Sequence, residues 1–118
     1  MERYTDTISG EELYVYTDER GSRDYYKDEA MSILHRLDGP AIEDASVHKE
    51  WYVNGKLHRL DGPAVEYADG GKVWWVDGKR HRLDGPAYEY ADGHKSWWVD
   101  GVFIIEINPS GKIIERME

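Results

Sequence analysis

The chain contains no cysteine, so disulfide bonds, thiolate metal sites and cysteine nucleophiles are excluded. No apolar run approaches the ~18–20 residues that a membrane span requires. Residues 1–10 also lack the basic and then apolar order of a secretion signal. We therefore expect a protein of the cytoplasm. Phenylalanine is scarce as well, with one Phe against five Trp and nine Tyr. These amphipathic rings favour half-buried positions and contact surfaces over a deep apolar core.

Basic residues are the other deficit, with 15 Lys and Arg against 24 Asp and Glu and a formal net charge of −9. Binding nucleic acid or an anionic membrane through general electrostatics requires the opposite balance. We therefore expect neither as a direct partner. The charge favours a protein partner with a basic surface, or simply serves solubility.

The segment HRLDGPA occurs three times, beginning at His35, His58 and His81, with a period of 23 residues. The three copies, 35–57, 58–80 and 81–103, are identical at thirteen of their 23 positions. A fixed period of this length indicates a repeat architecture, in which one small unit packs on copies of itself. Such stacks present extended binding surfaces, whereas catalysis requires a few unlike residues that converge once.

The middle copy shows what the unit is. Residues 64–68 and 72–76 have the short, aromatic and β-branched composition of strands, and Asp-Gly-Gly at 69–71 between them is typical of a hairpin loop. Asp77-Gly78 forms a second turn that leads to the next His-Arg. We expect an all-β fold, in which stacked β-hairpin repeats form one elongated, curved antiparallel sheet with capping segments.

The identical residues alternate along each strand, so each strand has one uniform face and one varied face. A three-residue loop at 69–71 is the register we favour over a two-residue loop, because it places the identical residues of both strands on one face. It pairs Ala68 with Lys72, Glu66 with Trp74 and Ala64 with Val76. The uniform face then carries a Trp ladder (Trp51, Trp74, Trp97) and a Val ladder (Val53, Val76, Val99).

The varied face is the candidate binding surface, because stacking alone does not dictate residues that differ between copies. We expect it to bind the partner through eight residues: Asp44, Glu50, Tyr52, Tyr67, Trp75, Tyr88, Tyr90 and Trp98. The alternative is that these rings form the core and are covered by the N-terminal segment.

The two ends differ from the repeats, as the caps of a solenoid do. Residues 1–34 are expected to form an N-terminal cap with a degenerate repeat, and residues 104–118 a C-terminal capping hairpin around Asn-Pro-Ser-Gly. Glu106, Lys112 and Glu115 would keep the last strand from pairing with other molecules.

The order W-x-V-D-G-K-x-H, then D-G-x-A-x-x-Y-A-D-G, resembles the MORN repeat, which has the same period. The resemblance covers 35–103 closely and 11–34 loosely, and these residues match in order: Trp74, Asp77, Gly78, Lys79, His81, Gly85, Tyr90, Asp92 and Gly93. The chain departs from that pattern where Arg-Leu-Asp-Gly-Pro-Ala replaces a short Gly-x-Gly segment. It is similar to MORN-like variants of bacterial and phage proteins, including antitoxin or immunity-type proteins. The resemblance implies an elongated β-sheet used for protein contacts, without catalytic residues.

Metal binding and catalysis are not expected, and neither is a cofactor. His35, His58 and His81 recur at equivalent positions, which lie about 9–10 Å apart when each repeat contributes two strands. Ligands of one zinc ion must approach it to about 2.1 Å, so these histidines are expected to bond to nearby backbone instead. A local metal site at His48 or His94 stays open. Recurring Glu and Lys residues favour a cross-strand charge ladder, and no phosphate loop, nucleophile elbow or HExxH motif is present.

Three functions remain. The first is a protein-binding module, either an inhibitor, an immunity protein or a phage anti-defence protein that binds a host or toxin protein. The second is a binder of nucleotides or other aromatic ligands, which would use Trp, Tyr and Arg side chains. The third is a structural scaffold for assembly.

Overall fold

The computed structural model describes residues 2–117, which form fifteen β-strands and no helix. The strands are β1 (Glu2–Thr5), β2 (Glu12–Thr17), β3 (Arg23–Tyr26), β4 (Ile42–Glu43), β5 (Lys49–Glu50), β6 (Tyr52–Val53), β7 (Lys56–Leu57), β8 (Val65–Glu66), β9 (Lys72–Val73), β10 (Trp75–Val76), β11 (Lys79–Arg80), β12 (Tyr88–Glu89), β13 (Lys95–Val99), β14 (Val102–Ile107) and β15 (Ile113–Arg116).

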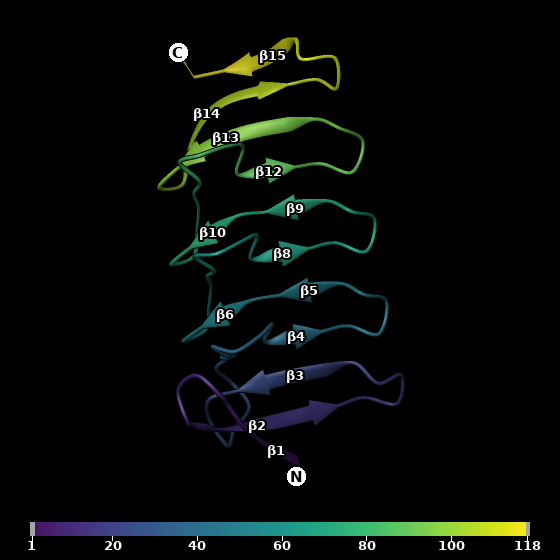
Figure 1. Ribbon diagram of the computed structural model, residues 1–118, viewed down its shortest axis with the longest axis vertical. Helices are drawn as coiled ribbons and strands as arrows, with labels where there is room; N and C mark the ends of the chain where they lie inside the picture. The colour runs from purple at the N-terminus through teal and green to yellow at the C-terminus, as the bar shows by residue number, and fades with distance from the viewer. Residues whose placement is uncertain (1, 118) are drawn as a thin grey trace.

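Eleven strands form one open sheet in the order β1-β2-β3-β4-β5-β8-β9-β12-β13-β14-β15, and neighbouring strands pair antiparallel. Two further hairpins, β6–β7 and β10–β11, continue the repeats along one side. Figure 1 shows the hairpins stacked along the long axis, with the two chain ends at opposite ends of the stack. The molecule measures 50 × 27 × 21 Å. The expected elongated all-β sheet is therefore confirmed.

The first hairpin of each repeat has the expected faces but a different register. In the middle copy Val65 is opposite Val73, and Glu66 is opposite Lys72 rather than Trp74. The loop still has three residues but comprises 68–70, one residue earlier than predicted. The Gly70 N–H donates to the carbonyl of Tyr67, and Gly70 has a φ of 97°, which glycine adopts readily. The shift preserves the alternation, so the identical residues still share one face.

The second hairpin of each repeat turns at Asn54-Gly55, Asp77-Gly78 or Asp100-Gly101. Both residues of each turn have positive φ, for example 50° at Asp77 and 78° at Gly78. This geometry is that of a type I′ turn, which matches the twist of two antiparallel strands. Trp75 lies opposite Arg80, and both residues occupy positions that differ between the three copies.

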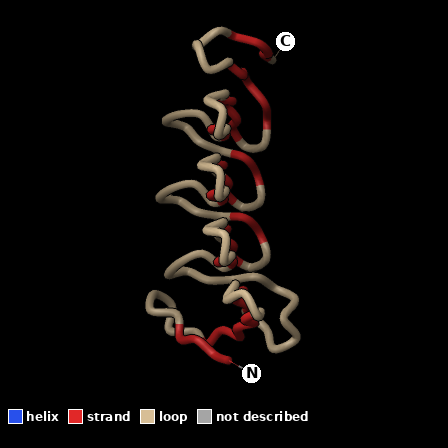
Figure 2. Tube along the Cα trace, turned by 90° about the vertical axis from the view of Figure 1, so that its right-hand side faces the viewer, coloured by secondary structure: helices blue, strands red, loops and turns tan. Residues whose placement is uncertain are grey.

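On the uniform face, each HRLDGPA segment folds back so that its arginine covers an aromatic ring. The guanidinium carbon lies 3.9 Å from the ring centroid in the pairs Arg59–Trp51 and Arg82–Trp74. Arg59 also donates to Asp61, to the carbonyl of Pro63 and to Glu66. These contacts confirm that the His-Arg segment bonds to neighbouring backbone and carboxylates. Figure 2 shows the connecting segments repeated at equal intervals along the stack.

Recurring Glu and Lys residues lie opposite each other across the sheet, as expected, although the carboxylates of Glu66 and Glu89 form their ion pairs with Arg59 and Arg82. Glu66 is opposite Lys72 within its hairpin and opposite Lys49 of the preceding copy. Glu89 is opposite both Lys95 and Lys72 in the same way. The register places opposite charges next to each other on neighbouring strands, which favours this pairing over one that places like charges opposite.

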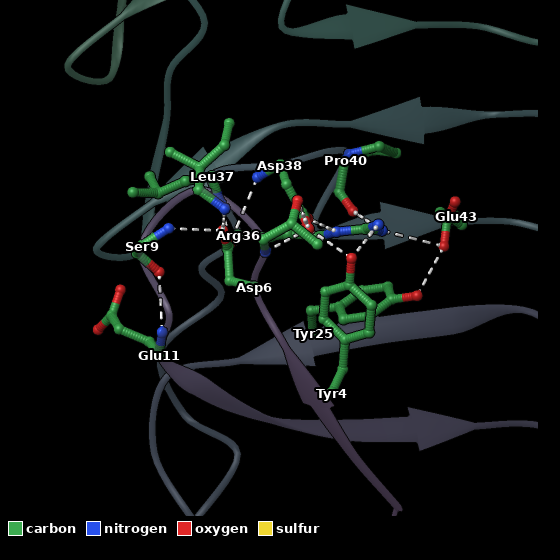
Figure 3. Close-up of polar contacts among 12 residues, drawn as sticks. Tyr4, Asp6, Ser9, Glu11, Tyr25, Arg36, Leu37, Asp38, Pro40 and Glu43 are labelled. Carbon is green, nitrogen blue, oxygen red and sulfur yellow. Dashed lines mark hydrogen bonds and ion pairs between the residues drawn. The ribbon is translucent and has the colours of Figure 1, made fainter.

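The N-terminal end is closed by a polar network on the first HRLDGPA segment (Figure 3). The Asp38 carboxylate accepts hydrogen bonds from Tyr4, Thr7 and Arg36. Its side chain is 6% exposed, whereas the equivalent carboxylate of Asp61 is 88% exposed. The cap therefore buries the one loop that has no preceding repeat.

At the other end, β14 and β15 form the last hairpin, and every residue of β15 is exposed. Glu106 and Glu115 lie opposite each other, and two isoleucines next to them, Ile113 and Ile114, are about half exposed. Among residues 2–117 there is no helix of the length and hydropathy needed to cross a lipid bilayer.

Candidate functional site

The varied face of the sheet carries the predicted binding residues, and small buried side chains occupy other varied positions of the same strands. Val65, Val73 and Ser96 are at most 4% exposed. The rings are half-buried, except that Tyr67 is 39% exposed. The rings are therefore partly packed and partly accessible to a partner. The excess of Trp and Tyr in the sequence had suggested such half-buried positions.

The N-terminal segment does not cover these rings. Its side chains and backbone bond to the first HRLDGPA segment, through Asp6 to Leu37 and through Thr7 to Asp38. The first HRLDGPA segment lies on the uniform side of the sheet, because its Arg36 covers the ring of Tyr25 in the same way that Arg59 covers Trp51. The alternative in which the N-terminal segment buries the varied face is therefore wrong.

The first part of the face is centred on Glu50. Its carboxylate accepts a hydrogen bond from the Tyr52 hydroxyl at 2.8 Å and lies 2.6 Å from Nε2 of His48. Burial and the nearby Glu50 carboxylate raise the pKa of Tyr52. Asp44 lies in the adjoining loop, where hydrogen bonds from Ser46 lower its pKa. The carboxylates of Glu50 and Asp44 thus border this end of the face.

The second part consists of tyrosine rings. Tyr88 and Tyr90 are stacked with their centroids 3.9 Å apart and their planes 8° from parallel. Together with Tyr67 they line a hollow of about 220 Å³. Burial, and next the negative charge of Glu106, raise the pKa of Tyr90. The Tyr67 ring continues toward the first part, 5.3 Å from the ring of His48.

The third part surrounds Arg80. Its guanidinium carbon lies 5.4 Å from the ring centroid of Trp75, 5.2 Å from that of Tyr88 and 4.9 Å from that of Trp98. The Trp98 indole N–H donates to Ser96 at 3.0 Å, and its ring packs edge-on against Phe103. These contacts order both indole rings at the surface.

The structure therefore brings the predicted residues together in two groups. Trp75, Tyr88, Tyr90 and Trp98 form one group, and Asp44, Glu50 and Tyr52 form the other, with Tyr67 between them. Sequence reasoning did not include His48 or Arg80 in the binding face, and it considered His48 only for a local metal site. Both occupy positions that differ between copies, which was the signal used for the other residues.

The uniform side has larger hollows that repeat along the stack. One of about 370 Å³ is lined by residues that include Trp51, Arg59 and Leu60, and one of about 600 Å³ by their equivalents, Trp74, Arg82 and Leu83. Leu60 and Leu83 are 81% and 80% exposed. The arginines here are already paired with carboxylates, so these hollows offer repeated apolar contacts rather than a distinctive charge.

The repeated histidines anchor turns. Nδ1 of His58 accepts the backbone N–H of Asp77 at 3.0 Å, and Nδ1 of His81 accepts that of Asp100 at the same distance. His35 accepts the N–H of Asn54 in this way and contacts Glu11 through Nε2. Within residues 2–117, no three His, Asp or Glu side chains are placed to hold a metal ion.

No family model matches the chain, and no curated protein or solved structure shows significant similarity to it.

Proposed function

We propose that the protein is a non-enzymatic, MORN-like binding module that recognises a protein partner through the varied face of its sheet. Within that class, small size, acidity and repetition favour an inhibitor, an immunity protein or a phage anti-defence protein that occludes a host or toxin protein.

The observation that carries this proposal is a row of ordered, half-exposed rings on a single-layer sheet. Trp and Tyr are the residues most enriched in interface hot spots, where a few side chains provide most of the binding energy. The packing of Trp75 and Trp98 on Arg80 restrains them before binding, so little conformational entropy is lost when a partner docks. Varied residues on a uniform scaffold also allow specificity.

Charge supports a partner with a basic surface. The net charge is −9, and Asp44 and Glu50 border the aromatic row. Long-range attraction of this kind accelerates association and weakens as salt is added. It affects the affinity of the final complex less.

The experiment begins with the partner recovered from the native host and measures its affinity by surface plasmon resonance. Trp98→Ala should weaken binding by about 2 kcal/mol, as loss of a hot-spot residue does. Glu50→Lys should mainly slow association. Leu83→Ala is the matched control, because Leu83 is exposed on the uniform side and its loss should leave the affinity unchanged.

Loss of binding in Leu83→Ala with full binding in Trp98→Ala would place the interface on the uniform side and refute the proposal. If the host yields only a nucleotide or another aromatic ligand, the protein is a small-molecule binder instead. Recovery of copies of the chain alone would favour the scaffold function.

A further inference from the structure

Arg80 differs from the repeated arginines in its surroundings. Arg36, Arg59 and Arg82 each pair with an aspartate two positions later and with a glutamate seven positions later. Among residues 2–117, the buried Nε of Arg80 is a side-chain nitrogen without a hydrogen-bond partner, and no ion pair joins Arg80 to a carboxylate. Arg80 is thus a cation held in place without a counter-charge.

The aromatic rings determine which part of this cation stays available. Trp75, Tyr88 and Trp98 surround the guanidinium at centroid distances of 5.4, 5.2 and 4.9 Å. Rings attract a cation through their faces but accept hydrogen bonds poorly. The N–H donors of the guanidinium therefore keep their capacity for an oxygen ligand. Guanidinium donors form a planar fork that matches the two oxygens of a carboxylate.

A hollow of about 300 Å³ adjoins Arg80. It is lined by Trp75 and Trp98, by Lys79 and Arg80, and by two turn glycines, Gly78 and Gly101. No aspartate or glutamate lines it. The site therefore combines two indole surfaces with positive charge in a protein whose net charge is −9.

Stacking of the repeats does not require this charge. The positions equivalent to Arg80 in the first and third copies hold Leu57 and Phe103. Both are apolar, and Phe103 packs against Trp98 as part of the same row. An apolar side chain thus satisfies the fold at this position, and the arginine is a feature of one copy.

We propose that Arg80 and the indoles of Trp75 and Trp98 form a binding site for a carboxylate side chain of the protein partner, an aspartate or glutamate flanked by apolar residues. The carboxylate accepts N–H groups of Arg80, while the flanking residues pack on the two indoles. This inference rests on the proposed function and specifies its central contact. The basic surface of the partner steers approach at long range, and one acidic residue docks at the centre.

The test needs no native partner. The probe is the peptide acetyl-Ala-Leu-Glu-Leu-Ala-amide, and its control has Gln in place of Glu, which keeps shape and removes charge. Each is titrated into the full ¹⁵N-labelled chain while the Arg80 Nε–H and the indole N–H signals of Trp75 and Trp98 are followed by NMR. The Glu peptide should bind about tenfold more tightly than the Gln peptide, as a charge-assisted contact provides.

Three variants test whether Arg80 causes the preference for the Glu peptide over the Gln peptide. Arg80→Leu, which copies the first repeat, should fold and should bind both peptides equally. Arg80→Lys should retain only part of the preference, because an ammonium lacks the planar fork. Arg3→Leu is the matched control, since Arg3 pairs with Glu12 at the exposed N-terminal edge, and it should behave as the parent chain.

Equal binding of the Glu and Gln peptides to the parent chain would overturn the proposal, as would a preference that survives Arg80→Leu. Inorganic phosphate is titrated in parallel, and a response to phosphate without one to the Glu peptide would also overturn it. The outcome is separable from the proposed function. If the peptide preference holds but the native partner ignores Trp98→Ala, the carboxylate site stands and the proposed interface fails.

Discussion

Replacement of Trp74 by alanine tests whether the Trp ladder of the uniform face holds the repeats together. Trp74 belongs to the middle copy, so a repeat lies on each side of it. Its ring is covered by Arg82 at 3.9 Å, and its backbone N–H donates to the carbonyl of the buried Ala87 at 2.7 Å. The substitution removes the ring and leaves the backbone contact intact.

The expected loss in the free energy of unfolding depends on the burial of the Trp74 ring and on its contact with Arg82. Replacing a fully buried Trp by Ala costs about 3–5 kcal/mol, and because Trp74 is half-buried we expect about 3 kcal/mol. Of this, about 0.5–1 kcal/mol is the contact with Arg82. Neighbouring repeats stabilise each other, so the whole domain should unfold about 10 °C lower, as the entropy of unfolding of a domain of this size implies.

Urea unfolding and thermal melting, both followed by circular dichroism, measure these quantities. A double-mutant cycle with Arg82→Ala isolates the stacking energy. Leu83→Ala is the control, because Leu83 is 80% exposed and its truncation should change stability by less than about 0.5 kcal/mol. An unchanged melting curve for Trp74→Ala would show that the ladder does not hold the repeats, and the assignment of the two faces would be reversed.

Three further outcomes are expected. Burial raises the pKa of Asp38, but hydrogen bonds from Thr7, Tyr4 and Arg36 outweigh it and hold that pKa well below its usual range. The stability Asp38 contributes is therefore complete above the pKa of about 3.9 of unfolded aspartate and is lost as pH falls toward the folded pKa. Urea midpoints at pH 7 and pH 3 should differ less in Asp38→Asn than in the parent chain. His81→Ala should cost about 1 kcal/mol, the value of the lost hydrogen bond to the Asp100 N–H, and an unchanged urea midpoint would contradict the turn-anchoring role. Far-UV circular dichroism should show β-structure with little helix, and a helical content of one third would contradict the fold.

The fold was predictable because its main determinants are local. Each copy carries its own turn residues, such as Asp77-Gly78, and its own strand residues, so repetition of the sequence predicts repetition of the hairpin. The register of the first hairpin was not predicted. Its loop starts one residue early, because Gly70 rather than Gly71 takes the positive φ of 97°. The middle copy has two adjacent glycines, whereas the third copy has glycine only at the equivalent position, Gly93, and that was the signal for the register.

The N-terminal cap illustrates a second limit of sequence reasoning. Insertions there interrupt the period, so nothing aligns Tyr4 or Asp6 with the loop that they contact. Asp6 is fully buried and accepts the backbone N–H groups of Ile8, Ser9 and Leu37. A pairing across some thirty residues depends on three-dimensional packing, and a single sequence carries no periodic signal for it.

The candidate site was predictable only in part, for a reason that follows from repetition itself. Identical positions are explained by stacking, so we interpreted the residues that differ as candidates for function, and the structure places their rings together on one face of the sheet. Comparison of the copies does not show which of the varied residues matters most for binding. Three rings from different strands, β10, β12 and β13, surround the Arg80 guanidinium, and among residues 2–117 its buried Nε has no hydrogen-bond partner. In the sequence Arg80 is one basic residue next to Lys79 and His81, whereas in space it is an unpaired cation between two indoles. The copies on either side have Leu57 and Phe103 at that position, so the repeat unit tolerates a residue of different character there without loss of its hairpin.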